Sequence, residues 1–311
     1  MNSINRPAPK FDWFVPIDGD GNHIGTVSAE RPPTFEYLRQ VVQAAEDTGY
    51  YSLLIPTRFS NGLFEETSPL AETWTTATAL AAVTKKIRFL VAVRPGFISP
   101  GMWAQMASTF SNISNGRLDI NVVPGGIQGD FERLGVSTDH AQRYALATEF
   151  IEACKHLWEK PAPVDYTGKV IKLERAMVSP GPVGDGPRWY LGGASESALS
   201  LAGQQADNLL MWIQPLAQIT ELLERAKDRF QKNARTAEFG IRTHVIVRNT
   251  ESEAWNAAED LLSEANELVK QQRQASFSGT AMVGQKAQSR SYREHRIGRR
   301  LWNGISTVRV N

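Results

Sequence analysis

Short apolar runs alternate along this chain with longer amphipathic stretches, and this alternation is the main structural signal in the sequence. Each apolar run has the length of a buried strand, and the stretches between the runs carry apolar residues at helical spacing. Such an alternation predicts repeated βα units and a parallel sheet. The predicted strands are the runs 12–16, 51–56, 87–93, 118–123, 188–193, 208–213 and 241–247.

The interleaved order favours an α/β fold of the (β/α)8 TIM-barrel type with insertions, formed by a single domain over residues 1–311. Two Rossmann halves are disfavoured, because no GxGxxG motif follows any predicted strand. No run after residue 247 can serve as an eighth strand. We therefore expect the last strand and helix to be missing from the 311-residue sequence, and we favour a longer chain over an edge covered by a partner. The predicted helices cover residues 34–49, 71–84, 101–114, 141–158, 196–206, 216–234 and 251–272.

Several helix ends carry recognisable residues. Ser68-Pro69 and Ser99-Pro100 each precede an apolar-periodic run, which predicts a capping serine with proline in the first turn. Asn115-Gly116 predicts a left-handed stop after the helix 101–114. The proline- and glycine-rich residues 161–188 are predicted to form an excursion from the barrel with a small hairpin around Thr167-Gly168.

Composition narrows the class of protein. The net charge is +1, from 34 basic and 33 acidic residues, so no overall field favours nucleic acid or an anionic membrane. Neither a signal peptide nor a membrane span is evident, which predicts a cytoplasmic protein. The single cysteine, Cys154, lies among apolar residues at helical spacing and is expected to be a buried core thiol. The histidines show no metal-binding spacing, so no metal is expected and difficult chemistry requires an organic cofactor.

The working residues of such a barrel lie at the carboxyl ends of its strands. After the run 188–193, Gly193 and Ser195 lead directly into a helix, whose first amides could bind phosphate. A tight turn with Ser195 as a simple cap is an equally good interpretation. After the run 118–123 comes a long polar loop, and long loops in compact domains are often functional. The candidate residues there are Asn121, Asp130, His140, Arg143 and Tyr144.

Residues 239–248, FGIRTHVIVR, are typical of a strand, with Arg242 and His244 on the same face as Ile246. An inward guanidinium needs an anion, so a structural ion pair and an anionic ligand are both open. Arg309, near the chain end, is a third candidate for the same anion. Residues 286–300 are strongly basic, and they form either a solvated segment or part of a mobile lid over residues 272–300.

Eight ordered motifs, among them FVPIDGDGNHIGT, RFLVAVRPGFISP, SNGRLDINVV, YLGGASE and LWNGISTVR, resemble the bacterial-luciferase-like FMNH2-dependent monooxygenases. The similarity covers residues 11–311 and is closest to the alkanesulfonate monooxygenase branch. This resemblance implies a homodimer or homotetramer that uses FMNH2 supplied by a separate NAD(P)H-dependent FMN reductase. It also implies that O2 is used to cleave the C–S bond of an organosulfonate, with release of sulfite and an aldehyde.

The same resemblance implies roles for individual residues. Arg242, His244 and Arg309 are the implied catalytic residues, and Phe14 and Trp212 join them on the substrate side. The implied flavin-binding residues are Thr57, Asn121, Asp130, His140, Arg143, Tyr144, Gly193 and Ser195.

Departures from the branch pattern concern the substrate. Asp18 replaces a histidine, Leu70 replaces a cysteine, Pro124 replaces a threonine, and Arg58-Phe59 resemble the dimethylsulfone monooxygenase branch. A sulfone, a sulfosugar or another organosulfur or heterocyclic substrate is therefore an alternative, as is a non-catalytic flavin-binding homologue.

Overall fold

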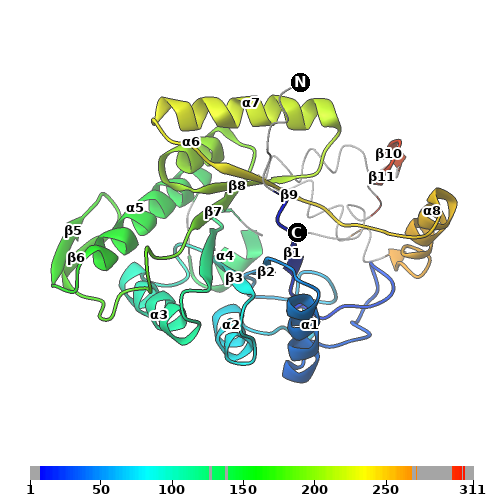
Figure 1. The fold of residues 1–311 in the computed structure, drawn as a ribbon, viewed down its shortest axis with the longest axis horizontal. Coiled ribbons are helices and arrows are strands. Elements are labelled where there is room, and N and C mark those ends of the chain that lie inside the picture. The colour runs from blue at the N-terminus through cyan, green and yellow to red at the C-terminus, as the bar shows by residue number, and fades with distance from the viewer. Residues whose placement is uncertain are drawn as a thin grey trace.

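A single seven-stranded parallel sheet organises the protein, which we describe from a computed structural model covering residues 8–125, 128–136, 139–267, 271, 296–302 and 304 (Figure 1). Each neighbouring pair of strands is parallel, as the strand–helix alternation predicted. In sheet order the strands are β1 (Asp12–Phe14), β2 (Ser52–Ile55), β3 (Arg88–Val93), β4 (Leu118–Val122), β7 (Trp189–Gly192), β8 (Asn208–Trp212) and β9 (Glu238–Arg242).

Helices follow the strands and cover the outer face of the curled sheet (Figure 1). The arrangement is that of a half-barrel, which confirms the predicted α/β class. The short helix α4 lies in the loop after β4, which was predicted only to be long and polar. The helices are α1 (Phe35–Asp47), α2 (Thr73–Ala82), α3 (Pro100–Ile113), α4 (Gln128–Arg133), α5 (His140–Glu159), α6 (Glu196–Gln205), α7 (Leu216–Lys232) and α8 (Glu251–Asp260).

The core between the sheet and these helices is strongly aromatic. Trp103 of α3 is completely buried, and its ring centroid lies 5.1 Å from that of Phe150 and 5.9 Å from that of Trp189. Cys154 is also buried among these residues, as predicted, and burial raises the pKa of its thiol. Because the core fills the space between sheet and helices, functional polar side chains are expected at the strand ends and in the loops.

Two of the three predicted helix-end signals are confirmed. Ser99 caps α3 by accepting a hydrogen bond from the amide of Met102, and Asn115 and Gly116 adopt positive φ angles of 53° and 77° after its end. The Ser68-Pro69 prediction is wrong, because α2 begins only at Thr73. The carboxylate of Glu72 accepts the first amides of α2 and so supplies the cap that Ser68 was expected to provide.

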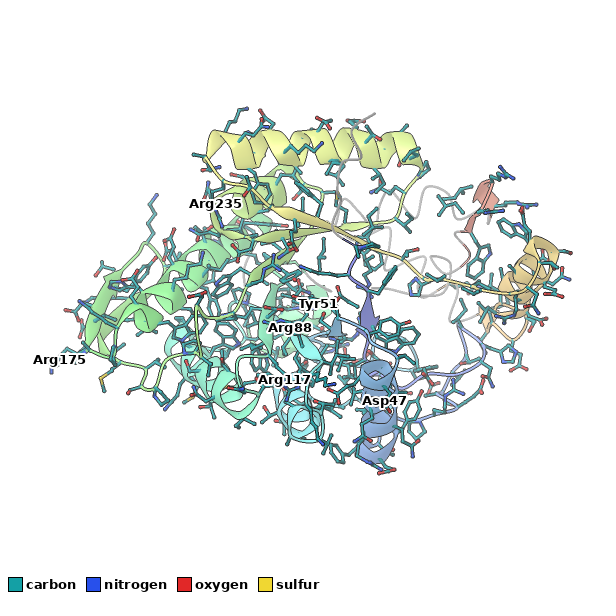
Figure 2. The ribbon with its side chains drawn as sticks, in the orientation of Figure 1. Asp47, Tyr51, Arg88, Arg117, Arg175 and Arg235 are labelled. Atoms are coloured by element: carbon teal, nitrogen blue, oxygen red, sulfur yellow. The ribbon has the colours of Figure 1, made fainter. Side chains whose placement is uncertain are left out.

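The excursion at 161–188 contains the predicted hairpin. Strands β5 (Val164–Thr167) and β6 (Lys172–Ala176) pair antiparallel, and the amide of Gly168 donates to the carbonyl of Ile171 at 2.8 Å. Figure 2 shows Arg175 at the outer end of this excursion, away from the parallel sheet. The hairpin therefore adds no residue to the carboxyl end of the sheet.

Two predicted elements have different bounds. The predicted strand 241–247 is wrong, since β9 ends at Arg242, where its partner β8 also ends and backbone pairing stops. The predicted helix 251–272 is interrupted, because α8 ends at Asp260 and the carbonyl of Leu261 accepts the amide of Ile24; residues 267 and 271 are helical again. Of the predicted basic lid 272–300, only residues 296–300 are described. They form β10 (Arg296–Gly298) and the turn to β11 (Leu301–Trp302).

The edges of the sheet, β1 and β9, are connected by side chains rather than by a ladder of backbone hydrogen bonds in the described residues. At the amino ends, Lys10 and Glu238 form an ion pair at 3.2 Å. At the carboxyl ends, the guanidinium of Arg242 lies 4.4 Å from the ring centroid of Phe14. We call this side-chain connection the seam. It joins the first and last strands of the curled sheet, so both contribute to one mouth.

The amino ends of the strands carry structural ion pairs. Arg88, labelled at the centre of Figure 2, donates two hydrogen bonds of 2.8 Å to Asp119. A cavity of about 520 Å³ lies at this end, with Arg188, Asp207 and Glu238 in its wall. Salt bridges join Arg188 to Glu238 at 3.0 Å and Arg235 to Asp207 at 3.2 Å, so these charges are already paired. The paired charges at the amino ends of the strands therefore stabilise the fold, and catalytic chemistry is expected at the carboxyl ends.

No helix within the described ranges is both long and apolar enough to cross a membrane.

Candidate functional site

The carboxyl ends of six strands bring together six of the predicted site residues. Phe14, Trp212 and Arg242 are the last residues of β1, β8 and β9, and Asn121 lies one residue before the end of β4. Thr57 follows β2, and Gly193 follows β7. Residues that are far apart in sequence thus share one face of the half-barrel, as the parallel topology requires. This mouth divides into two sides with different chemistry.

The first side is formed where α5 meets the start of α6. Ser195 is the N-cap of α6, and its hydroxyl accepts the amide of Ala198 at 3.2 Å. Tyr144 of α5 hydrogen-bonds Ser195, and burial raises the pKa of the Tyr144 phenol. A neutral phenol and a serine hydroxyl beside free helix amides are suitable donors for a phosphate. Ser195 therefore acts as the cap that one interpretation predicted, and phosphate binding at this turn stays a prediction.

Gly193 is required at this turn. Its φ angle is 153°, and a Cβ added there would lie 2.6 Å from the Cβ of Ala198. The same Cβ would lie 4.0 Å from the hydroxyl oxygen of Tyr144. A side chain at this position would therefore push α6 away and fill the space beside the phenol.

Arg143, next to Tyr144, is buried to 7 % exposure and lies over the ring of Phe131 at 5.0 Å. The guanidinium of Arg94 lies over the same ring at 5.6 Å and over that of Phe97 at 5.3 Å. The aromatic side chain of α4 thus packs against two cationic groups, each at cation–π distance. This packing holds Arg143 near Tyr144, whose phenol pKa its charge affects.

Asp130, a predicted flavin contact, is fully buried and bound to protein groups. Its carboxylate accepts hydrogen bonds from Arg94 at 3.1 Å, from the Ser60 hydroxyl at 2.9 Å and from the Phe59 amide at 3.4 Å. Arg94 also donates to the carbonyl of Thr57 at 3.2 Å. Burial lowers the pKa of Arg94, an effect that Asp130 opposes. This ion pair holds the loop after β2 in place, and direct contact of Asp130 with flavin stays a prediction.

Asn121 offers an open acceptor. Its side-chain oxygen is buried and has no hydrogen-bond partner in the part of the chain that the structure describes. A buried polar atom of this kind is costly unless a bound group satisfies it. Thr57 is half-buried and follows β2, which is separated from β4 by β3 alone. Thr57 and Asn121 can therefore both contact a ligand with polar edges.

The second side lies at the seam. The guanidinium of Arg242 is held between two aromatic rings, 4.2 Å from the centroid of Trp212 and 4.4 Å from that of Phe14. Both rings lie at cation–π distance from the guanidinium, whose hydrogen-bond donors lie along its edge. An edge-on guanidinium in an aromatic wall suits an oxyanion on an otherwise apolar molecule.

The other predicted residues fall outside these two sides or outside the described residues. His244 is exposed and lies two residues beyond the end of β9, so the strand alternation that placed it beside Arg242 does not apply. His140 is the first residue of α5, but its side chain is not among those described. Arg309 also lies outside the described residues, and its role stays a prediction.

Sequence reasoning did not identify Arg94 or Phe131 as site residues. Arg94 had a usable signal, since a charged residue directly after the buried run 88–93 stands at the carboxyl end of a strand. Phe131 had none, because a lone aromatic in a polar loop is more often simple packing. Only the fold of α4 shows that it separates Arg94 from Arg143.

Residues 10–305 match the family described as luciferase-like monooxygenase. The chain belongs to this family. The match covers every strand of the parallel sheet and both sides of the mouth. As a luciferase-like monooxygenase, the chain combines the predicted fold with a class of oxygen chemistry that the strand ends must support.

Solved structures with the same fold support this placement. A riboflavin lyase, crystallised with modified FMN and riboflavin, is 18 % identical with a TM-score of 0.77, over 87 % of this chain and 71 % of its own. A long-chain alkane monooxygenase is 18 % identical with a TM-score of 0.75, over 96 % and 77 %. EDTA monooxygenase from Chelativorans sp. BNC1 is 14 % identical with a TM-score of 0.71, over 85 % and 72 %. The names cover very different substrates, so the shared luciferase-like fold leaves the substrate of this chain to its own residues.

Proposed function

We propose that this chain is an FMNH2-dependent monooxygenase that uses O2 to cleave the C–S bond of an organosulfonate and releases sulfite and an aldehyde. The observation that supports this substrate class best is Arg242, whose guanidinium lies between Phe14 and Trp212 at the seam. A sulfonate presents three oxygens to the guanidinium edge, and its alkyl part can contact the two rings. The sequence motifs of the alkanesulfonate branch point to the same substrate.

The residues of the first side fit FMN. Tyr144, Ser195 and Arg143 would hold its phosphate at the start of α6, where the helix dipole also favours an anion. Asn121, with its unsatisfied oxygen, and Thr57 would hold the flavin ring, whose N–H groups are donors. When bound, reduced FMN supplies the two electrons that allow one atom of O2 to enter the substrate and the other to leave as water.

The protein's own groups would bind and orient the substrate. Phe14 and Trp212 keep water from the faces of Arg242, which strengthens its attraction for an oxyanion and for the charge that develops on the departing sulfite. His244 and Arg309 belong to the proposal as further groups on the substrate side, on the strength of the sequence motifs. The proposal also includes a separate NAD(P)H-dependent FMN reductase, a homodimer or homotetramer, and a cytoplasmic location.

Sulfite release tests the proposal directly. The protein, FMN, NAD(P)H and a flavin reductase are mixed with a panel of organosulfonates, and sulfite is measured. We expect sulfite from the wild type and none from Arg242→Ala, while FMN affinity stays within about twofold because Arg242 lies on the other side of the mouth. Arg39→Gln, a change at a half-buried arginine of α1 that pairs with Glu36, serves as the control. Equal sulfite release from wild type and Arg242→Ala would return Arg242 to a structural role.

A second candidate keeps the flavin chemistry but oxidises a sulfone or another organosulfur or heterocyclic compound. It is favoured by Arg58-Phe59, which resemble the sulfone branch and lie in the loop that Asp130 holds. Mass spectrometry of products formed under 18O2 separates the two, since sulfonate cleavage places the label in an aldehyde. A failure to bind FMNH2 in anaerobic titration would contradict both, and would also exclude a non-catalytic flavin-binding homologue.

A further inference from the structure

Two separate departures from the branch pattern, Asp18 and Arg58, contact each other. The Nε of Arg58 donates to the carboxylate of Asp18 at 2.9 Å, across 40 positions of sequence. Asp18 has 0 % side-chain exposure, and Arg58 has 7 %. A buried ion pair between two loops is expensive to build, so its presence at the mouth calls for a reason beyond stability.

The carboxylate of Asp18 fixes the base of the Arg58 guanidinium. Its second oxygen accepts the amide of Gly62 at 2.9 Å, and its backbone carbonyl accepts the amide group of Asn61 at 2.9 Å. A Cβ at Gly62 would lie 2.8 Å from Nη1 of Arg58, so glycine there provides the room that the guanidinium occupies. Arg58 is therefore held in one orientation by groups on both loops.

The outer edge of Arg58 is not used by the protein. Neither Nη1 nor Nη2 donates a hydrogen bond within the described ranges, where only the bond from Nε occurs. Both nitrogens are also absent from the fully buried polar atoms that lack a partner, so the 7 % of the side chain that stays accessible includes them. A guanidinium anchored at Nε presents two parallel N–H donors at its far edge, which matches the two oxygens of a carboxylate.

Arg58 lies at the mouth, in the loop after β2. It follows β2 by three residues, and β2 pairs with β1, whose last residue Phe14 stacks on Arg242. The phosphate side lies instead at the start of α6, after β7. Arg94, whose pKa is lowered by burial and also by the charge of Arg58, already has its own carboxylate in Asp130. Arg58 therefore brings to the mouth two donors that no described protein group accepts.

We propose that Arg58, anchored by Asp18, binds a second oxyanion of the substrate, so that the substrate is an organosulfonate that also carries a carboxylate. This inference rests on the proposed function for the first anion, which Arg242 binds. It adds a specificity-determining residue in the loop after β2. A substrate with two acidic groups would be held at both ends, with its reacting carbon between them.

The test compares two probes that differ only in the second group, 3-sulfopropanoate and propane-1-sulfonate. Each is titrated into the FMN-saturated full chain by calorimetry and is assayed for sulfite release. We expect wild type to prefer 3-sulfopropanoate. Arg58→Gln should lower both affinity and kcat/KM for it by about 10- to 100-fold, the range for a lost charged hydrogen-bonding partner, and should change propane-1-sulfonate by less than about threefold.

Two variants protect the result against misfolding. Arg58→Lys keeps a cation beside Asp18 but loses the two parallel donors, so it should fold normally and still lose the preference. Arg39→Gln should behave as wild type. Equal losses for both probes, no preference in the wild type, binding of neither probe, or a matching loss of FMN affinity in Arg58→Lys would each overturn the inference.

The two proposals fail in different ways. If both probes give sulfite and Arg58→Lys does not change their ratio, the role of Arg58 is wrong and the function stands. If neither gives sulfite but calorimetry shows the preference and its loss in Arg58→Lys, the oxyanion position stands and sulfonate cleavage is wrong.

Discussion

Removal of the Asp130 carboxylate should destabilise the protein and should also release the loop after β2 on the first side of the mouth, where FMN is proposed to bind. Asp130→Ala leaves the guanidinium of Arg94, which is 6 % exposed, without its partner at 3.1 Å. Breaking a buried ion pair from one side costs about 3–5 kcal/mol. The Ser60 hydroxyl and the Phe59 amide lose their acceptor as well, which places the expected loss toward the upper part of that range.

The assay is urea unfolding followed by tryptophan fluorescence, with FMN affinity measured on the folded variants. Since a domain of this kind is stable by only about 5–15 kcal/mol, the midpoint should fall by a large fraction. The double variant Asp130→Leu with Arg94→Met removes both charges and should recover part of the loss. Its FMN affinity should stay low, because the loop at Thr57 is no longer held by Arg94.

Asp228→Ala is the matched control, because Asp228 pairs with Lys232 on the exposed surface of α7. It should leave the midpoint nearly unchanged. A loss in Asp130→Ala no larger than that of the control would refute the reasoning. The reasoning would also be refuted if the double variant lost more free energy of unfolding than the two single variants lost together.

Three further outcomes are expected. Tyr144→Phe removes the phenol that meets Ser195 and should weaken FMN binding about tenfold without changing stability greatly, as fluorescence quenching would show. Glu46 is desolvated, but three backbone amides donate to it and its pKa lies below the usual 4.5. Its contribution is therefore present above pH 4.5 and is lost as the pH falls below that value, so Glu46→Gln should flatten the acid side of the stability profile. Trp103→Leu leaves a void among four aromatic rings and should cost about 3 kcal/mol in urea unfolding, whereas an unchanged midpoint would contradict tight packing there.

The strand pattern was enough to predict the parallel sheet and its order along the chain, because buried parallel strands are continuous apolar runs. It failed at residues 243–247, which are as apolar as a strand but lie beyond β9, whose pairing with β8 ends at Trp212 and Arg242. The end of a strand depends on the length of the strand that it pairs with, and the sequence of one segment does not show its partner. The same reason explains why His244 was placed beside Arg242.

The site was predictable where a residue stands at a strand end and unpredictable where it depends on a loop. Phe14, Asn121 and Arg242 follow from topology alone. The contact between Asp18 and Arg58 does not, since each is one polar residue in a long connection and their meeting depends on the path of both loops. The sequence marked both positions as unusual, and the structure shows that they form one pair.

The seam has a consequence for how the enzyme is made. Its ion pair joins residues 228 positions apart, Lys10 and Glu238, so the first strand must wait for most of the chain to be synthesised before it meets the last. The phosphate side is formed by α5 and the start of α6, which leave the ribosome earlier and lie close together in sequence. Because local contacts form faster than distant ones, the proposed function implies that FMN would find a nearly complete half-site on a nascent chain, while substrate selection would be acquired last.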